Sequence, residues 1–345
     1  MGLDSVRIIP NVRQRRRLRN LGATIVFENL VMPASLSSLP LIAIEIGGSK
    51  LQLATGDTSG FIAQRTRFEV NRKAGAEGIL QQIDAGLQSL LEHSKPVAVG
   101  VGYGGPVNWR TGQIVCSHHI EGWDGFNLAD WITNRTGLPA FVENDANAAA
   151  LGEAHFGAGR GLDPVFWMNA GSGVGGGLVV GGHLYHGAPP GEMELGHLRL
   201  DRRGAITEDF CSGWSVDRLV REEIAKNTDG ALARVVRQEG WVSGEARALT
   251  PALAIADRAA AEILDEVAGS MAYALSHAVH LLHPEVIVLG GGLALLGEAL
   301  RGRVAAALPP LLMDAFRPGP TVRLAELMED AVLAGSFAVA AQRLL

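Results

Sequence analysis

Cysteine is scarce in this sequence, no apolar run is long enough to cross a membrane, and positive charge is not in excess. The two cysteines, Cys116 and Cys211, lie far apart among 345 residues, so they can build neither a disulfide framework nor a four-cysteine metal site. The net charge of -6 gives no overall basic field to attract nucleic acid or an anionic membrane. We therefore expect no nucleic-acid partner, no membrane partner and a cytoplasmic protein.

The composition is that of an ordinary globular protein, with 47% hydrophobic and 19% charged residues. A chain of this length holds about two domains. The first part differs, because residues 1–39 contain a basic cluster between Arg13 and Arg19. Such a tail could contact an acidic partner, but we expect a poorly ordered N-terminal extension.

Strands and glycine turns alternate along the rest of the chain in two similar cycles. Apolar patterning predicts strands at 41–46, 51–55, 61–68, 97–101, 165–168, 177–180 and 286–289, with another near Ala140. It predicts helices at 76–91, 253–282, 294–308 and 330–343. Each cycle runs strand, glycine turn, strand, helix, and then an apolar strand that ends in glycines.

This repeated order indicates an α/β protein whose two halves face each other across a cleft. We expect a small domain at residues 40–144 and a large domain at 145–329. The C-terminal helix, residues 330–345, is expected to pack on the small domain.

The stretch 139–148 places polar side chains where a strand ends and a helix begins. Open α/β sheets bind their ligands at this edge. A carboxylate there can accept a proton from a substrate hydroxyl, and the helix N-terminus favours its charged form. Asp145 is therefore a candidate general base, although Asp145 or Asn144 could instead only cap the helix that runs toward Ala154.

The second glycine turn, residues 171–176, fits the G-x-G-x-x-G pattern of dinucleotide-binding proteins. That pattern requires a following helix, whereas residues 177–182 are typical of a strand, so a nicotinamide enzyme is disfavoured. Glycine and serine in a hairpin still expose backbone N–H groups and a hydroxyl, which suit phosphate oxygens. Plain turns without a ligand remain the alternative.

Five motifs then follow one another in the order typical of a known family. They are residues 45–50 (EIGGSK), 102–107 (GYGGPV), 143–147 (ENDAN), 194–197 (ELGH) and 288–292 (VLGGG). They resemble the D-x-G-G-T-K, G-x-P-G-P-V, E-N-D-A-N, E-x-G-H and V-L-G-G-G motifs of the ROK family of sugar kinases and sugar-responsive repressors. The resemblance implies a two-domain, actin-like and ribonuclease H-like sugar kinase fold with its active site in the interdomain cleft.

The resemblance also implies roles for individual residues. Asp145 would be the general base, and the sugar would be held by Gly105, Asn144, Asp145, Glu194, His197 and Glu208. ATP would be bound by Glu45, Gly47, Gly48, Ser49, Lys50, Gly171, Ser172 and Gly173, with Gly291 and Gly292 near the nucleoside. Mg²⁺ would accompany ATP near Glu45.

Several positions depart from the family pattern. Glu45 replaces an aspartate at the expected Mg²⁺ edge, and His118 and His119 replace a Pro-Asn pair. The family's cysteine-rich zinc loop is replaced by residues 198–207, which contain no cysteine. We therefore expect no structural zinc, because a closed zinc site needs thiolate or imidazole ligands.

Two functions remain in view. The first is an ATP-dependent kinase acting on a hexose or N-acetylhexosamine, which we expect to be a homodimer. The second is a catalytically weak sugar-sensing protein of the same family. No DNA-binding module is visible before residue 40, and Asp145 is present, so the kinase is favoured. The sequence does not identify the sugar.

Overall fold

The computed structural model describes residues 39–48, 50–117, 120–191 and 193–344. Ser49, His118, His119 and nearly all of the N-terminal extension lie outside the described residues. The described chain is an α/β protein with two five-stranded mixed sheets and a small hairpin, β5 Val107–Asn108 with β6 Gln113–Ile114.

The first sheet has the strand order β3-β2-β1-β4-β7. Its strands are β1 Pro40–Ile46, β2 Lys50–Asp57, β3 Ile62–Glu69, β4 Val99–Tyr103 and β7 Ala140–Asn144. β1 is antiparallel to β2 and parallel to β4, and β4 is parallel to β7. The carboxyl ends of β1, β4 and β7 therefore meet at one edge of the sheet.

Strand β1 is buried on both faces, and its side chains alternate between two helical layers. Ile42 and Ile44 belong to one core with α1 Gly75–His93 and α2 Leu128–Thr136. Leu41 belongs to another core with α10 Ala331–Leu344. Each such aliphatic side chain contributes about 1.5–3 kcal/mol on burial, which fixes the strand register.

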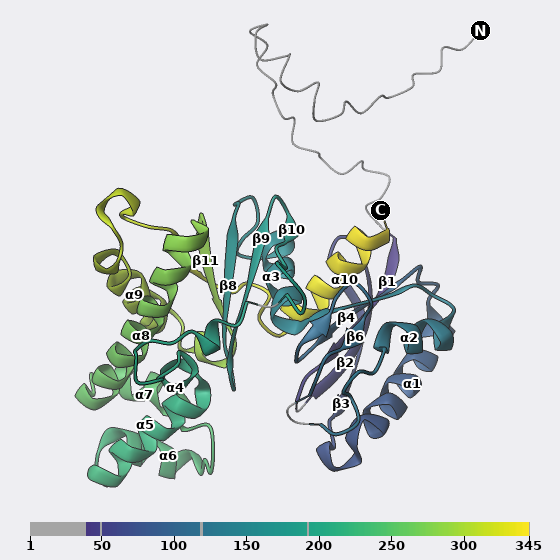
Figure 1. Ribbon diagram of the computed structural model, residues 1–345. Coiled ribbons are helices and arrows are strands. Elements are labelled where there is room, and N and C mark those ends of the chain that lie inside the picture. Colours follow the sequence, from purple (N-terminus) through teal and green to yellow (C-terminus); the bar gives the residue numbers. More distant parts are fainter. Residues whose placement is uncertain (1–38, 49, 118–119, 192, 345) are drawn as a thin grey trace, which may run out of the picture. The chain divides into compact units, whose positions relative to one another are not determined.

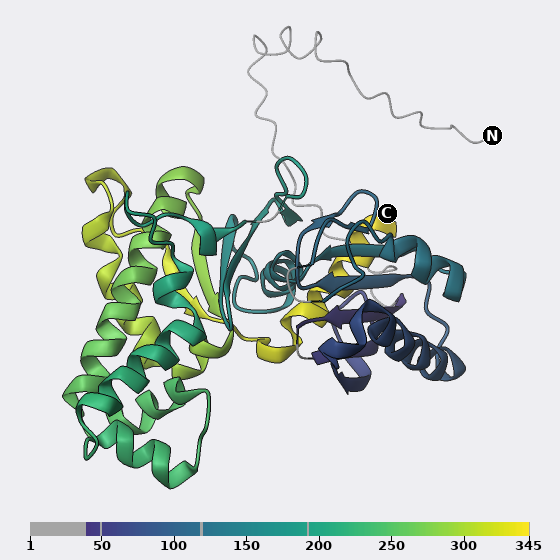
Figure 2. The ribbon, with the colours of Figure 1, turned by 60° about the horizontal axis from the view of Figure 1, so that its bottom comes forward.

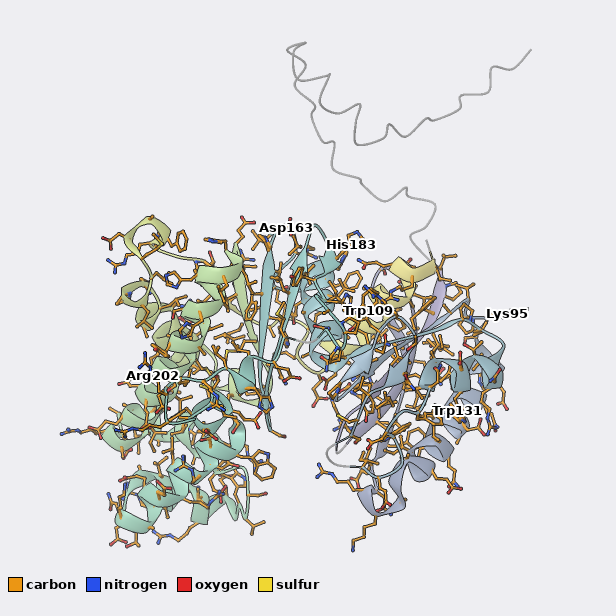
Figure 3. All side chains as sticks on the ribbon, viewed as in Figure 1. Lys95, Trp109, Trp131, Asp163, His183 and Arg202 are labelled. Carbon is orange, nitrogen blue, oxygen red and sulfur yellow. The ribbon has the colours of Figure 1, made fainter. Side chains whose placement is uncertain are left out.

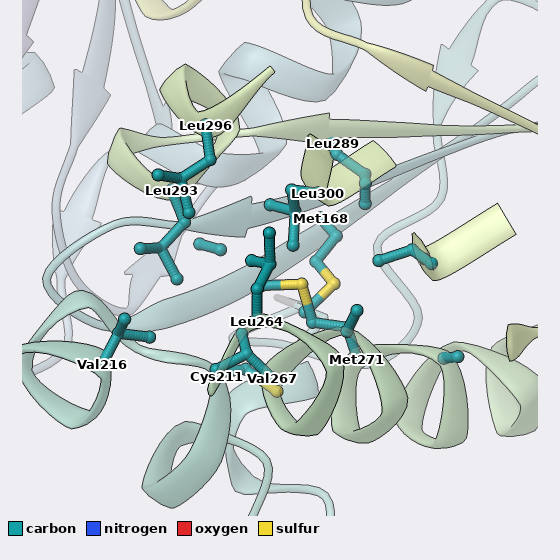
Figure 4. Close-up of a cluster of buried hydrophobic side chains, with 14 of the residues drawn as sticks. Met168, Cys211, Val216, Leu264, Val267, Met271, Leu289, Leu293, Leu296 and Leu300 are labelled. Carbon is teal, nitrogen blue, oxygen red and sulfur yellow. The ribbon is translucent and has the colours of Figure 1, made fainter. Parts of the chain in front are cut away.

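The second sheet repeats the pattern, in the order β10-β9-β8-β11-β12. Its strands are β8 Val165–Ala170, β9 Val174–Val180, β10 His183–Leu184, β11 Val286–Gly290 and β12 Thr321–Leu324. Met168 packs on one face against Leu264 and Met271 of helix α8 Arg258–Leu282 (Figure 4). The same core includes residues of α4 Glu208–Cys211, α5 Gly213–Lys226, α6 Ala231–Glu239, α7 Leu249–Ala254 and α9 Glu298–Ala307.

Helices α3 Asp145–Phe156 and α10 lie side by side between the two sheets (Figures 1 and 2). Their backbones approach closely because small residues face each other. A side chain at Gly335 would lie only 1.6 Å from the Ala148 carbonyl oxygen, and one at Gly152 only 2.5 Å from that of Ala331. Both glycines are therefore required for this contact.

Two expected helices are interrupted. The helix predicted at 253–282 is wrong in its first part, because α7 ends at Ala254 and α8 begins at Arg258. Ala256 takes a left-handed conformation (φ 56°), and Asp257 caps α8 by accepting a hydrogen bond from the Ala260 N–H (2.8 Å). The helix predicted at 294–308 is also divided, since a 3-10 turn ends at Leu296 and Gly297 (φ 64°) precedes α9.

Among the helices of the described residues, none is sufficiently long and apolar to span a bilayer.

Candidate active site

The junction between β7 and α3 brings three polar residues to the edge of the first sheet. Asn144 is the N-cap of α3, because its side-chain oxygen accepts hydrogen bonds from the N–H groups of Ala146 (2.9 Å) and Asn147 (3.1 Å). Its amide nitrogen donates to the Gly105 carbonyl (3.2 Å). Asn144 therefore caps the helix, while the neighbouring Asp145 carboxylate interacts only with backbone N–H groups of this same helix terminus among the donors that shift its pKa.

Asp145 lies in an environment that opposes its ionisation. Loss of water around the carboxylate, followed by the negative charges of Glu45 and Glu194, raises its pKa to about 7, while the backbone N–H of Ala146 acts in the opposite sense. A carboxylate with a pKa near neutrality is well matched to accept a proton at physiological pH.

Asp145 lines a cavity of about 330 Å³, which we call the smaller cavity. Its wall combines the β1–β2 hairpin, the start of α3, the end of β8, the turn after β11 and the start of α10. The lining includes Glu45, Lys50, Asp145, Ala146, Trp167, Asn169, Gly291, Gly292, Met328 and Glu329. Asp145 thus lies at a cavity that is lined by residues from both sheets, their turns and the neighbouring helices.

The first hairpin is held by a short network around Glu45, which is buried. One Glu45 oxygen pairs with the Lys50 ammonium (3.0 Å), and the other accepts from the Gln52 amide (2.8 Å). The turn closes with the Gly47 N–H donating to the Lys50 carbonyl (2.9 Å). Arg72 supports it from outside, donating to the Gly48 carbonyl (2.6 Å).

The second hairpin joins β8 to β9 and is tied to α4. The Gly171 N–H donates to the Gly173 carbonyl (2.9 Å), and Glu208 accepts from the Val174 N–H (2.8 Å). A side chain at Gly173 would lie 2.7 Å from a Glu208 oxygen. Glu208, which the resemblance assigns to the sugar, therefore also holds this hairpin in place.

A cavity of about 580 Å³, the larger cavity, lies beyond the second hairpin. Its walls come from the hairpin, the start of α5, the segment before α7 and the 3-10 turn after β11. The lining includes Gly171, Ser172, Gly213, Trp214, Asp217, Arg247, Thr250, Gly292, Leu293 and Leu296. Apolar walls with a few polar groups are typical of a small-molecule site of this volume.

The structure distributes the expected site residues over several neighbourhoods. Glu45, Lys50, Asp145, Gly291 and Gly292 meet at the smaller cavity, and Gly171, Ser172 and Gly292 meet at the larger one. Asn144 contacts Gly105, and Gly173 lies against Glu208. Glu194 precedes a 3-10 turn, Leu195–His197, and both Glu194 and His197 are exposed. Gly47 and Gly48 form the first turn.

Sequence reasoning missed much of the larger cavity. Trp214, Asp217 and Arg247 lie outside the five motifs that carry the resemblance. Asp217 is buried and accepts from the Ala246 N–H (2.8 Å), so its role in the wall depends on a contact far along the chain. Asn169 could have been found, because it is a polar residue at the carboxyl end of a buried strand.

The segment 198–207 forms a self-contained turn. Asp201 accepts hydrogen bonds from the N–H groups of Arg203 (2.7 Å), Gly204 (2.9 Å) and Ala205 (3.2 Å). Arg199 and Ile206 pair across it as an isolated antiparallel bridge. In the described part of the chain, no three histidine, cysteine or acidic side chains are grouped so as to hold a metal ion.

The fold is the two-domain fold of the actin-like sugar kinases. The sequence matches the ROK family over residues 41–343, and the chain belongs to that family. The expected fold, two-domain and actin-like, is thereby confirmed. The chain is 28% identical over 314 residues to a glucokinase from Thermotoga maritima, covering 89% of this chain and 98% of that protein.

Solved structures place the fold among both kinases and regulators. A ROK family glucokinase from Streptomyces griseus, in complex with glucose and AMPPNP, is 30% identical with a TM-score of 0.77, covering 88% of this chain and 99% of that one. A ROK family transcriptional regulator is 20% identical with a TM-score of 0.78, covering 88% and 78% of the two chains. The second likeness shows the fold alone.

Proposed function

We propose that this protein transfers the γ-phosphoryl group of ATP to a hydroxyl of a hexose or N-acetylhexosamine, with Asp145 as the general base. The observation that carries the proposal is the carboxylate of Asp145, with its pKa of about 7, at the junction of β7 and α3 and facing the smaller cavity. Similarity to a glucokinase over nearly its whole length supports the same activity.

The proposed step needs a proton acceptor and little other covalent chemistry. Asp145 takes the proton from the sugar hydroxyl while the oxygen of that hydroxyl bonds to the γ-phosphorus. The bond from the γ-phosphorus to the bridging oxygen then breaks, and this oxygen leaves with ADP. Positioning and charge neutralisation account for the remaining catalysis.

The two cavities together suit a nucleoside triphosphate. The larger cavity offers Trp214, Leu293 and Leu296 as apolar surface for a base, and it is bordered by Gly171 and Ser172 of the second hairpin. The backbone N–H groups of both glycine turns and the hydroxyl of Ser172 suit phosphate oxygens. The bound nucleotide supplies the transferable phosphoryl group.

The residues present fit Mg²⁺ only as a companion of the phosphates. Both oxygens of Glu45 already have protein partners, Lys50 and Gln52. Mg²⁺ commonly keeps several waters and takes few protein ligands beside phosphate oxygens. We propose that Glu45 and Asp145 would hold the ion indirectly, through waters bound to it.

The sugar side of the site is proposed to consist of Gly105, Asn144, Glu194, His197 and Glu208. Carboxylate, amide and imidazole groups pair with both the donors and the acceptors of sugar hydroxyls. The exposure of Glu194 and His197 leaves both side chains accessible to a ligand. The homodimer and the cytoplasmic location stay predictions.

The second candidate is a sugar-binding regulatory protein of the same family. It is kept because the family includes a transcriptional regulator of the same fold. Both candidates predict sugar binding, and only the kinase predicts turnover that depends on Asp145.

An ADP-release assay over a panel of hexoses and N-acetylhexosamines separates the two. We expect sugar-dependent ADP release with at least one member of the panel, and its loss in Asp145→Asn. Sugar binding by calorimetry without any ADP release would support the regulatory protein instead. Absence of both binding and release over the panel would overturn the proposed function.

A further inference from the structure

The segment that follows β10 leads to Glu194, and it is anchored at its start by His186. The ring nitrogen Nε2 of His186 lies 2.7 Å from an oxygen of Glu143. Both side chains are largely withdrawn from solvent, at 12% exposure for His186 and 2% for Glu143. Glu143 stands two residues before Asp145, so the pair joins this segment to the candidate catalytic junction.

The same carboxylate also holds the junction itself. Its other oxygen accepts from the Asn144 N–H (3.1 Å) and from the Asn147 side-chain amide (3.0 Å). Asn147 in turn donates to the Gly191 carbonyl (3.3 Å). The segment 185–191 is therefore tied twice to the residues that flank Asp145.

An aromatic stack fixes His186 from its other side. Trp109, in the hairpin between β5 and β6, lies parallel to the imidazole, with ring centroids 4.1 Å apart and an 18° interplanar angle. The Arg343 guanidinium stands 4.6 Å from the Trp109 ring centroid and donates to the Trp109 carbonyl (3.2 Å). Figure 3 shows Trp109 and His183 beside the C-terminal part of α10.

Gly191 allows the segment to lie this close. Its backbone is left-handed (φ 83°), and a side chain there would lie 2.8 Å from the His186 carbonyl oxygen and 3.3 Å from the Trp109 indole nitrogen. The far end of the segment is fixed separately, because Met193 pairs with Gly176 of β9. Glu194 follows directly.

We propose that His186 is a positioning residue for sugar recognition, which sets Glu194 relative to Asp145 through its bond to Glu143 and its stack on Trp109. The inference rests on the proposed function, because it takes the ligand of this site to be a sugar. Loss of His186 removes one of the two ties between this segment and the residues that flank Asp145, while the Asn147–Gly191 bond and the Met193 bridge remain. The contacts of the sugar with Glu194 should then loosen. The larger cavity, whose lining includes neither His186 nor Glu194, should not change.

His183 provides a matched control. It is a histidine of the same stretch, is exposed, and contacts Gln342 of α10 at 3.3 Å, but within the described chain it makes no hydrogen bond to Glu143 and no ring contact with Trp109. His186→Ala and His183→Ala therefore remove the same type of side chain from nearby positions. Only the first of these side chains is bonded to Glu143.

The test compares steady-state constants and calorimetric sugar affinity for the two variants, using the sugar that the panel identifies. We expect His186→Ala to raise the sugar KM and Kd about tenfold, the effect of losing one hydrogen bond to a charged partner, with an unchanged ATP KM. His183→Ala should leave all three within twofold of the wild type. His186→Gln, which can restore the donor to Glu143, should recover most of the affinity.

His186→Phe keeps a ring on Trp109 and lacks the donor, so it serves if the alanine variant does not fold. We expect it to raise the sugar KM as His186→Ala does. A folded His186→Phe with the wild-type sugar KM, or an equal rise in the sugar and ATP KM, would overturn the inference while leaving the kinase intact. A wild type that neither binds nor phosphorylates any sugar of the panel would overturn the proposed function first.

Discussion

The two ends of helix α3 carry carboxylates that are both shifted toward protonation but are surrounded differently. At the first end, Asp145 lies beside two other acids, Glu45 and Glu194, and lines a cavity. At the last turn, Glu153 is fully buried, and loss of water raises its pKa. There, however, the two oxygens accept from the N–H groups of Ala158 (2.8 Å), Glu326 (3.2 Å) and Leu327 (2.8 Å).

This difference distinguishes a reactive carboxylate from a structural one. Glu153 fastens the end of α3 to the chain between β12 and α10, and its neighbours are backbone donors from two segments. Asp145 is surrounded by acids and accepts locally from its own helix terminus. A carboxylate without donors from distant segments can change its protonation state at little structural cost, which is what a general base requires.

The largest expected effect is the loss of transfer in Asp145→Asn. The amide keeps the shape of the side chain but cannot accept the proton, so kcat should fall by ~10²–10⁴-fold with sugar affinity largely retained. Steady-state kinetics and calorimetry measure the two quantities. Turnover near that of the wild type would refute the role of Asp145.

The same variant should be at least as stable as the wild type above pH 7. Because the folded-state pKa of Asp145 is raised to about 7, the unfolded chain ionises this group first, and stability is lost as pH rises toward 7. Asparagine avoids this loss. The advantage in Tm should shrink as pH falls toward 4, and a larger advantage at pH 5 than at pH 8 would contradict the assignment.

The opposite result is expected at the other end of the helix. Glu153→Ala leaves three backbone N–H groups without their acceptor, one of them buried and two part-buried, so we expect the free energy of unfolding to fall by about 2–4 kcal/mol. The chemical step should change little, because Glu153 does not line the smaller cavity. Urea unfolding and kcat of the remaining folded enzyme separate the two effects. A stable variant with a large loss of kcat would erase the contrast between the two ends.

The pH dependence of kcat/KM tests the same contrast without a substitution. Asp145 must be ionised to accept a proton, so activity should fall about tenfold per pH unit below a pKa near 7. This acidic limb of the pH profile should be absent from the residual activity of Asp145→Asn. A limb near 4 would mean that the carboxylate behaves as an ordinary exposed aspartate.

Much of this arrangement could be predicted from the sequence, because the signals were local. The strands near Ile44 and Val288 are apolar runs between glycines, and Asp145 follows such a run at once. The role of Glu153 could not be predicted, since its partners Glu326 and Leu327 are far away in sequence. The break before α8 was missed because the apolar period continues across Asp257.

The smallest expected effect concerns the turn at residues 198–207, where the same distinction applies to an exposed carboxylate. Asp201 accepts from three backbone N–H groups of its own turn, so it belongs with Glu153 as a structural carboxylate. Asp201→Ala should lower the free energy of unfolding by about 0.5–2 kcal/mol, as expected for the loss of a capping side chain. Asp209, which accepts from the single Ile206 N–H (3.0 Å) among the described residues, offers a control with a smaller loss.

This turn occupies the place where the ROK family is expected to have its zinc-binding loop. The hydrogen bonds that Asp201 accepts already hold the turn together, so it needs no ion. We therefore expect far less than one zinc per chain in protein purified without added metal, and no change of Tm on chelation. Metal analysis and thermal unfolding measure both. Stoichiometric zinc, with unfolding on chelation, would show that a metal rather than Asp201 holds the turn, because a structural zinc site contributes directly to folding.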